Sequence, residues 1–476
     1  MTFDYKTLHF KAGLEIHQQL EGKKLFCHCP TLVNDSHPVD IVVQRKLRTS
    51  AGETGSVDVA AKYETAKNRM FVYEACSTSS CLVELDDEPP HDVNREALLV
   101  ALQIAKIMHA KTVDEVQFMR KIVVDGSNVS SFQRTAVIAL DGYIDTSKGK
   151  VSIASICLEE ESAKKIETKD TEVIYRLDRL GVPLIEIATG PDLQDPFHAQ
   201  EVAGILGMIL RSTGKVRRGL GSIRQDVNIS IQKGNRVELK GFQDLRSISK
   251  VIDVEIDRQL ALLKKGKKVE KEVRKVEPDF TTSFLRPMPG ASRMYPETDV
   301  TPISITSGML NSLEVPQLIT ERALGFEQKY GLSEVHAREI LKLNLSFDYY
   351  AENYKLSPEI LASVLIDIPK ELKARFKADV SKLTQQDFDF VFTHLQQETF
   401  GKEAVFDVLL TLSQGKKVDL HNYKSVSLDD VERFVKDLIK KNPTVSLGGL
   451  MGDVMKHYKG KVDGKKVMEL LKKFKP

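Results

Sequence analysis

The chain has 476 residues, of which 41% are hydrophobic, and this length and composition allow two to four domains with packed cores. Its 69 lysines and arginines nearly match its 67 aspartates and glutamates, so the net charge of +2 says nothing about nucleic-acid binding. No apolar run approaches the roughly 18 residues that cross a bilayer, and the N-terminus lacks a signal-peptide pattern, so we expect a soluble cytoplasmic protein.

The stretch Gly13–Leu20 alternates between apolar and polar residues, which predicts a strand with one buried and one open face. The polar residues share the open face: Glu15, His17 and Gln19. A carboxylate, an imidazole and an amide in one row could hold a divalent cation such as Mg²⁺. Because half-polar strands are common, the stretch taken alone favours an ordinary surface strand over a metal site.

Four of the five cysteines form two close pairs, whereas Cys157 stands apart: Cys27 with Cys29, and Cys76 with Cys81. An odd number of cysteines does not suggest a disulfide framework. Two close pairs separated by a long loop could form a structural zinc site. The spacings Cys-x-Cys and Cys-x4-Cys are not among the common zinc spacings, so this interpretation and unliganded thiols both remain open.

Up to about residue 305 the segments are short, β-branched and alternating, with glycines between them. Helical spacing of apolar residues predicts three helices in this region: Asn94–His109, Pro196–Thr213 and residues 248–264. The pattern predicts an α+β domain in which a large, mostly antiparallel sheet carries the helices.

Several predicted strands carry acids or amides on the face that should be open. The segment Val151–Glu161 ends in three glutamates and leads into a stretch, 162–165, that is expected to be helical. Glu186 is the only acid in an apolar strand, and a buried carboxylate needs a cation, a donor or solvent nearby. Two further strands alternate, 225–231 and Val237–Lys240. If all belong to one sheet, a metal-and-phosphate site could gather Glu15, His17, Glu160, Glu186, Asp226, Asn228 and Glu238.

Arginines border these strands, in particular around the glycine loop of Arg217–Arg224. Guanidinium groups bind phosphate bidentately, so phosphoryl transfer and RNA binding are both natural interpretations. The sequence contains no Walker-type phosphate loop and no dinucleotide-binding fingerprint that opens a βαβ unit. Any ATP site must therefore be of a kind that these motifs do not reveal.

The C-terminal third is expected to be helical. After a charged surface stretch, 264–271, and a proline-rich segment, 284–299, helices are predicted at Leu318–Tyr330 and Ser333–Leu345. Ser333 and Ser357 are suitable N-caps. From Val454 onward eight lysines face only two acids, which fits contact with RNA phosphates and fits a solvated helix face equally well.

Taken together, these segments resemble the B/E family of tRNA-dependent amidotransferase subunits, most closely its archaeal E type in glutamyl-tRNA(Gln) amidotransferase. The matching stretches are Gly13–His17, Leu25–Pro30, Cys81–His91, Arg120–Asn128, Phe132–Thr135, Tyr175–Ile187, Arg224–Asn228 and Leu285–Asp299. They span the first 300 residues. The helical character of the last third and the turn at Gly448–Gly452 match more weakly.

The resemblance implies a cradle-shaped kinase domain over residues 1–305, a helical linker over 306–375 and a tRNA-binding tail over 376–476. Such a protein uses ATP and Mg²⁺ to phosphorylate the glutamate misattached to tRNA(Gln). Ammonia then comes from a separate amidase- or asparaginase-like partner, the D-type protein of the archaeal enzyme. The alternative is a tRNA-binding scaffold that has kept the cradle but lost the chemistry, and a ligase acting on a free carboxylate is a third interpretation.

Carried over residue by residue, the resemblance implies the following site. The metal ligands are Glu15, His17, Glu160 and Glu186. The basic residues themselves supply further candidates: Arg224 as a catalytic residue, and Arg217, Arg218, Lys465, Lys466, Lys472 and Lys473 as RNA-binding residues. Two departures stand out: only Lys264–Asp279 fills the interval in which the E type carries an inserted domain, and Cys76 has no counterpart in the family pattern.

Overall fold

The computed structural model describes residues 3–33, 38–51, 55–242, 244–290, 294–423, 428–443, 445–458, 462 and 464–475. The chain divides into two compact units, Met1–Leu318 and Ile319–Pro476. The first unit combines sheets with helices and the second is helical, so the predicted α+β class is confirmed.

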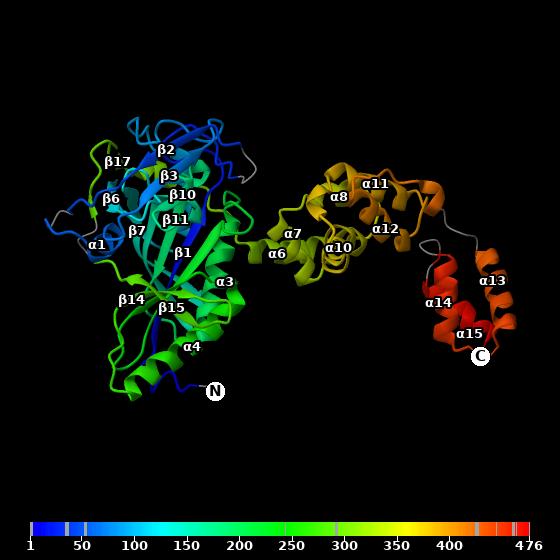
Figure 1. Ribbon diagram of the computed structural model, residues 1–476. Helices are drawn as coiled ribbons and strands as arrows, with labels where there is room; N and C mark the ends of the chain where they lie inside the picture. The colour runs from blue at the N-terminus through cyan, green and yellow to red at the C-terminus, as the bar shows by residue number, and fades with distance from the viewer. Residues whose placement is uncertain are drawn as a thin grey trace. The chain divides into compact units, whose positions relative to one another are not determined.

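The first unit is built on one large sheet (Figure 1). The strands follow the order β15-β14-β13-β12-β1-β11-β8-β7-β6-β16, and β4 pairs with β7. Neighbours are antiparallel, except that β13 and β14 run parallel. The strands are β1 (Lys11–Gln19), β4 (Lys111–Thr112), β6 (Phe118–Ile122), β7 (Phe132–Thr146), β8 (Gly149–Glu160), β11 (Pro183–Thr189), β12 (Ile223–Ser230), β13 (Val237–Lys240), β14 (Glu272–Val276), β15 (Thr282–Pro287) and β16 (Met294–Pro296).

Three helices cover one face of this sheet: α2 (Arg95–Ile107), α3 (Pro196–Ser212) and α4 (Leu245–Lys264). These are the three helices that the sequence predicts. Each begins where an Asn or Asp side chain accepts a backbone N–H, namely at Asn94, Asp195 and Asp244. Figure 1 shows α3 and α4 side by side, and α3 contacts β1 while α2 contacts β7 and β8. The covered face forms the main core and includes Leu14 and Ile16, so the alternate side chains of β1 lie on the open face.

Two smaller sheets complete the first unit, one with the order β2-β3-β10-β9 and one that pairs β17 with β5. Their strands are β2 (Ile41–Arg45), β3 (Met70–Ala75), β5 (Glu115–Val116), β9 (Lys164–Thr168), β10 (Glu172–Arg176) and β17 (Ile303–Ser304). Short helices accompany them: α1 (Val59–Thr65), η1 (Leu177–Arg179) and α5 (Ser307–Asn311). The prediction of a helix at 162–165 is wrong, because Lys164 and Lys165 begin β9 and pair with β10.

The interval between α4 and β15 is part of the main sheet. Its strand β14 pairs with β13 on one side and with β15 on the other. The predicted surface stretch 264–271 is the connection into β14 and contains no helix or strand after Lys264.

The second unit consists of α6 (Ile319–Tyr330), α7 (Glu334–Leu343), α8 (Phe347–Asn353), α9 (Pro358–Ala362), η2 (Ser363–Asp367), α10 (Ile368–Phe376), η3 (Val380–Lys382), α11 (Gln385–Gln396), α12 (Lys402–Ser413), η4 (Leu420–Tyr423), α13 (Leu428–Lys441), α14 (Leu447–His457) and α15 (Gly464–Phe474). As predicted, Ser333 caps α7 by accepting the N–H of His336. Ser357 precedes α9 but its side chain makes no capping bond.

This unit has two separate hydrophobic cores. One runs from Leu332 to Leu409 and so draws on both sides of position 375, and the other joins α13, α14 and α15. The division of the chain at 305 and 375 stays a prediction. Within the described residues no helix is both long and apolar enough to cross a membrane.

Candidate active site

Strand pairing brings the acids of three strands to one place on the open face. In the register of β1 with its neighbours, His17 lies opposite Glu186 on β11 and Glu15 lies opposite Asp226 on β12. Directly opposed residues on antiparallel strands point to the same side of the sheet. Because Leu14 and Ile16 occupy the covered side, these polar side chains meet on the open one.

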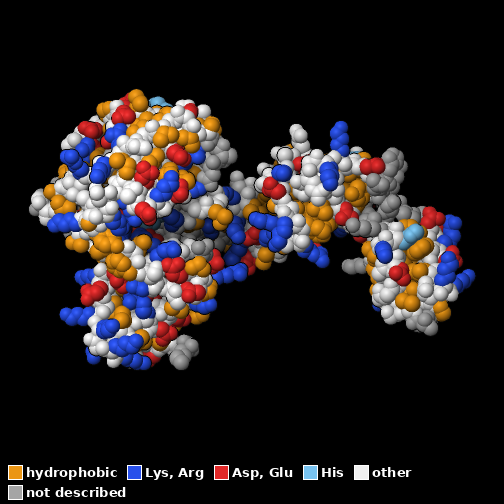
Figure 2. Space-filling view, viewed as in Figure 1, with side chains coloured by type: hydrophobic (Ala, Val, Ile, Leu, Met, Phe, Trp, Pro, Cys, Tyr) orange, Lys and Arg blue, Asp and Glu red, His pale blue; other side chains and the backbone are white. Residues whose placement is uncertain are grey.

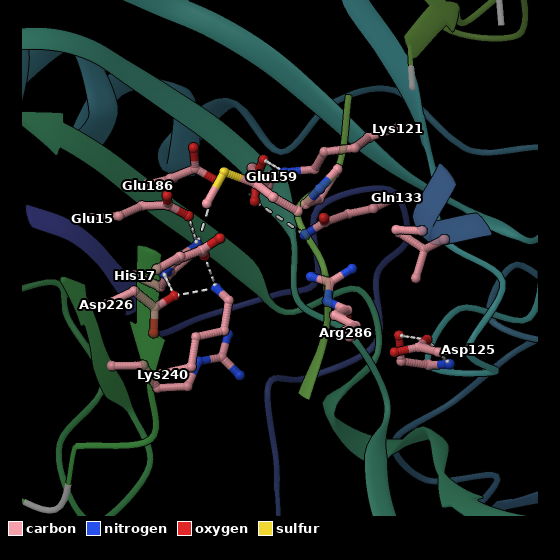
Figure 3. A pocket seen from close by; sticks show the side chains of 18 of the residues that line it. Glu15, His17, Lys121, Asp125, Gln133, Glu159, Glu186, Asp226, Lys240 and Arg286 are labelled. Atoms are coloured by element: carbon pink, nitrogen blue, oxygen red, sulfur yellow. Dashed lines mark hydrogen bonds and ion pairs between the residues drawn. The ribbon is translucent and has the colours of Figure 1, made fainter. Parts of the chain in front are cut away.

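His17 is the centre of the group (Figure 3). Its Nε2 atom lies 3.3 Å from Glu15 Oε1 and 3.4 Å from Glu186 Oε2. Burial lowers the pKa of His17, but the hydrogen bonds to the two glutamates outweigh burial and raise it to about 10. Burial raises the pKa of Glu186, but Lys121 and His17 hold it well below its usual value. The protonated imidazole therefore pairs with both carboxylates in this state, and Lys121 supplies a second positive charge beside Glu186.

The same three residues fit a divalent cation, because one ligand atom from each lies within 4.8 Å of the other two. Two carboxylates and one neutral imidazole would leave about three positions of an octahedral Mg²⁺ for water and phosphate oxygens. A bound cation would take over the charge that the His17 proton supplies, since a metal ligand must be deprotonated.

A second acidic group shares Glu15 and is neutralised by a lysine. Lys240 Nζ lies 2.5 Å from Asp226 Oδ2 and 2.5 Å from Glu238 Oε1. Burial lowers the pKa of Lys240, but these carboxylates and Glu15 outweigh burial and raise it above its usual value. Asp226 Oδ2 is also 4.0 Å from His17 Nδ1, so the second group supports the far side of the imidazole.

Glu160 does not join this group, contrary to the prediction that it is a ligand. The register places Glu159 opposite Leu184 of β11, on the cavity side, and the next residue points to the other side. Glu159 Oε1 is bonded by Lys121 and by Thr135 Oγ1 at 2.8 Å, and its Oε2 accepts from Gln133 Nε2 at 3.1 Å. Burial, followed by the charge of Glu186, raises the pKa of Glu159.

Glu160 belongs instead to a chain of buried ion pairs. Its carboxylate accepts from Arg134 Nη1 at 3.2 Å and from the Arg134 backbone N–H at 3.1 Å. Arg134 Nε donates to Glu297 Oε2 at 2.7 Å, and Glu297 also binds Arg120 at 2.5 Å. This chain of bonds attaches the segment after β16 to β6 and β7. The structure thus gives Glu160 a role in holding the sheet together.

The acidic group lies in a cavity of about 570 Å³, within the usual size of small-ligand sites. Its other walls include the loop at Asp125–Ser127, α1 and the end of β15. Two buried tyrosines hold the loop: Tyr73 Oη donates to Gly126 O and Tyr175 Oη donates to Asp125 O, each at 2.8 Å. Gly126 has a φ of +92° and faces the Phe71 ring, where a Cβ would lie 2.2 Å from a ring carbon, so only glycine fits.

Arg224, predicted to be catalytic, lines the cavity. Its Nη2 donates to both oxygens of Glu161, at 2.8 and 2.9 Å, and Gln19 Nε2 donates to the same carboxylate at 3.0 Å. Burial raises the pKa of Glu161, but Arg224 and Arg179 outweigh burial and lower it. Asn228 and Glu238, which were also expected on the polar surface, lie opposite each other on it: Glu238 lines the cavity and Asn228 lines a neighbouring one that shares Glu15.

Sequence reasoning missed several residues of the site: Lys121, Asp125, Gln133, Glu159, Glu161, Arg236 and Arg286. One signal could have corrected the choice between the adjacent glutamates. Counting by twos from the apolar Ile156 and Leu158 places Glu160 on the core side and Glu159 on the open side.

The structure brings three of the four predicted zinc ligands together. Ligand atoms of Cys27, Cys29, Cys81 and Glu84 all lie within 4.8 Å of one another. Cys27 Sγ donates to Glu84 Oε1 at 3.0 Å, and the buried Lys24 Nζ is 3.7 Å from the same oxygen. Cys76 lies outside the group and contacts Thr78 Oγ1 at 3.0 Å, so the fourth position belongs to a glutamate rather than to Cys76.

The predicted RNA-binding residues fall in two places. Arg217 and Arg218 form one side of the loop before β12, where the buried Gln18 Nε2 donates to Arg217 O at 3.1 Å. Lys466, Lys472 and Lys473 are exposed on α15, and the side chain of Lys465 lies outside the described residues. On the face shown in Figure 2, basic and acidic side chains are interspersed over both units, in keeping with the small net charge.

Two family models match the chain: the GatB/GatE catalytic domain over residues 10–311 and the GatB domain over residues 346–474. The chain therefore belongs to the GatB/GatE family. It is 36% identical to the E subunit of glutamyl-tRNA(Gln) amidotransferase from Methanosarcina acetivorans, over 99% of this chain and 98% of the relative. The E subunits from Archaeoglobus fulgidus and Methanocaldococcus jannaschii are 36% and 35% identical over 99% of this chain. The first of these alignments extends over 625 residues, against 476 in this chain, so the relative contains residues that this chain lacks.

Proposed function

We propose that the chain is the tRNA-binding subunit of an amidotransferase that converts glutamate misattached to tRNA(Gln) into glutamine, using ATP and Mg²⁺. The observation that carries the proposal is the group Glu15, His17 and Glu186 at the base of a charged cavity. The names of the relatives supply the substrate, since all three are E subunits of glutamyl-tRNA(Gln) amidotransferase.

The chemistry requires activation because the oxygen of a carboxylate is a poor leaving group. In the proposed reaction the glutamyl carboxylate attacks the γ-phosphorus of ATP, the bond to ADP breaks, and the product is an acyl phosphate. Ammonia then attacks the acyl carbon, a proton is lost, and phosphate leaves. Mg²⁺, held by Glu15, His17 and Glu186, would neutralise phosphate charge.

The protein's own contribution to this reaction is positioning and exclusion of water. Asp226 and Lys240 support the His17 ring, and Lys121 fixes Glu186 and Glu159 on the other side. Phosphoryl transfer needs little more than positioning and charge neutralisation, so no protein nucleophile is required. An acyl phosphate is hydrolysed by water, so ammonia should arrive through protein from a partner protein of the amidase or asparaginase type.

The test is ATP consumption by the purified chain with Mg²⁺ and either Glu-tRNA(Gln), Asp-tRNA(Asn) or uncharged tRNA, with and without the ammonia-producing partner. We expect turnover only with Glu-tRNA(Gln). The variants Glu15→Ala and His17→Ala should lose this turnover and keep their affinity for the charged tRNA. Absence of turnover even with the partner added would favour the silent scaffold, and an equal loss of tRNA affinity would refute the assigned roles.

A further inference from the structure

The basic side chains that line the cavity are of two kinds. Three of them bind carboxylates: Lys121 binds Glu159 and Glu186, Lys240 binds Asp226 and Glu238, and Arg224 binds Glu161. These three lysine and arginine side chains are fully engaged in neutralising the acids of the site. They have little positive charge left for an anionic substrate.

Arg236 and Arg286 are different. Both line the cavity, and no carboxylate among the described residues lies within ion-pair distance of either. Among the described residues the guanidinium of Arg236 donates only to Met288 Sδ, at 3.2 and 3.0 Å, and a thioether is a weak acceptor. Arg286 pairs with Val273 through its backbone, but its side chain makes no hydrogen bond within the described part of the chain, and Figure 3 shows it between Gln133 and Asp125.

Met288 relates the two arginines, which come from different segments of the sheet: Arg236 contacts it, and Arg286 lies two residues before it. Arg286 is in β15 and Arg236 immediately precedes β13. Residues two apart on an extended segment point to the same side, so Arg286 and Met288 face the same way, and Arg236 reaches Met288. Two unneutralised guanidinium groups therefore share one wall of the cavity.

From these contacts we infer that Arg236 and Arg286 bind the polyphosphate of the nucleotide, an inference that rests on the proposed function. Carboxylates outnumber lysines and arginines in the cavity lining, so a phosphate chain is repelled unless unpaired cations meet it. A guanidinium offers paired N–H donors that match two phosphate oxygens. The cation held by Glu15, His17 and Glu186 would meet the phosphates from the other side.

This assignment can be tested by substitution because neither arginine neutralises a buried acid. Replacing either one leaves no unpaired carboxylate, so Arg236→Gln and Arg286→Gln should fold, which thermal unfolding checks. The matched control is Arg95→Gln, since Arg95 is exposed on the first turn of α2 and does not line the cavity. Arg286→Lys keeps the positive charge but loses the paired N–H donors of the guanidinium group.

The experiment is calorimetric titration of the full chain with ATP, inorganic tripolyphosphate and adenosine, each with Mg²⁺. We expect each glutamine variant to bind ATP and tripolyphosphate about ten-fold or more weakly, with Arg286→Lys intermediate and with adenosine affinity and Arg95→Gln unchanged. Wild-type affinity for ATP in both glutamine variants would overturn the inference. If a parallel titration with charged tRNA showed weaker binding in variants that keep wild-type affinity for ATP, the arginines would be assigned to RNA instead. If the wild type binds neither ATP nor tripolyphosphate, the proposed function fails together with the inference.

Discussion

At the scale of single residues, the site balances each carboxylate with a nearby positive group. His17 serves Glu15 and Glu186, while Lys240 serves Asp226 and Glu238. Taking charges out of water is costly unless they are paired, so this balance lets a dense group of acids persist in a folded protein. It also means that the imidazolium of His17 can give way to a cation without leaving the two glutamates unneutralised.

Two of the predicted metal ligands, Glu186 and Glu160, should behave differently on substitution because they lie on opposite sides of the sheet. Glu186→Gln removes a ligand, so we expect the Kd for Mn²⁺, measured by electron paramagnetic resonance, to rise at least about ten-fold. Glu160→Gln weakens the buried bonds to Arg134, although Arg134 keeps its bond to Glu297. We expect the Mn²⁺ affinity to stay unchanged and the free energy of unfolding, measured in urea, to fall by about 1–3 kcal/mol.

The opposite pattern would restore the role that the family resemblance implies for Glu160. A Mn²⁺ Kd that rises with Glu160→Gln, while Glu186→Gln leaves it unchanged, would require the β8 register to differ from the one described. Glu159→Gln is the third member of the series. It tests whether Glu159, which faces the cavity, contributes to the Mn²⁺ affinity through its bond with Lys121.

How far the sequence predicts the site depends on how local the evidence is. Glu15 and Glu186 each stand between two apolar residues, and His17 follows Ile16 in the same alternation as Glu15, so alternation within one strand identifies them. Lys121 and Gln133 could not be found in this way, because they reach the site only through the pairing of β6 with β7 and β7 with β8. Arg286 lies in β15, which follows the Glu159 strand β8 by seven strands along the chain, and no local sequence pattern marks it as a site residue.

At the scale of elements, the tip of the β7–β8 hairpin is fastened to the start of α3. The buried His198 is central, since its Nδ1 accepts the N–H of Gln194 at 3.2 Å and its Nε2 lies 2.9 Å from Thr146 Oγ1. An Nδ1 that accepts a backbone N–H cannot carry a proton, so the ring is neutral and Nε2 donates to the hydroxyl. Thr146 in turn donates to Gly149 O across the hairpin.

This arrangement predicts a pH dependence of stability. Burial lowers the pKa of His198, and Lys148 adds to burial, while Glu201 and Asp195 oppose it without outweighing it. His198 takes up a proton near pH 6.5 in the unfolded chain but only at lower pH in the folded chain. The stability that its neutral ring contributes is therefore present above about pH 6.5 and is lost on acidification. Urea unfolding should show that the free energy of unfolding decreases between pH 7 and pH 5. We expect this decrease to be smaller in His198→Gln than in the wild type, by up to about 2 kcal/mol.

His9→Asn is the control for this measurement. His9 is exposed with a φ of +46°, a conformation that asparagine tolerates, so its replacement should leave the pH profile unchanged. A steeper loss on acidification in His198→Gln than in the wild type would contradict the neutral ring.

The cysteine group connects two distant segments, and we propose that it holds a structural zinc ion. Burial, followed by the charge of Glu84, raises the pKa of Cys81 to about 11, and the same causes raise the pKa of Cys27. Without a metal these thiols stay protonated, and a zinc ion would displace their protons. We expect about one zinc per chain by mass spectrometry, lost in Cys81→Ser and kept in Cys76→Ser. Equal zinc contents in the two variants would show that the metal, if bound, lies elsewhere.

Elements differ in how well their sequences predict them. The helices α2, α3, α4 and α7 carry both a periodic apolar stripe and a capping side chain, and all four are confirmed. The short stretch at 162–165 has helix-forming residues but becomes a strand, because pairing of β9 with β10 outweighs local propensity. The two close cysteine pairs predicted a common site that included Cys76, but the fold groups Cys27, Cys29 and Cys81 with Glu84 instead.

At the scale of the whole molecule, the cavity belongs to the first unit alone, since every residue that lines it lies before position 318. The second unit contributes helices with their own cores and, in α15, exposed lysines. This separation suggests that the chemistry on the glutamyl group and the grip on the RNA body are carried by different parts of one chain. The cavity forms in this chain without the additional residues that the relative from Methanosarcina acetivorans contains.

Removing the last three helices tests this separation. A cut after Asn442 would expose the buried Val431 and Val435 of α13, which pack against α14 and α15, so the cut should follow Tyr423 and remove the whole core. Because lysines that contact phosphates release counterions, we expect the 1–423 chain to bind tRNA more weakly and with a smaller dependence of log K on log salt. A minimal aminoacylated acceptor end, which lacks the RNA body, should be activated equally by both chains. Unchanged tRNA affinity and salt slope would mean that the α15 lysines form only a solvated helix face, the other interpretation of the basic terminus.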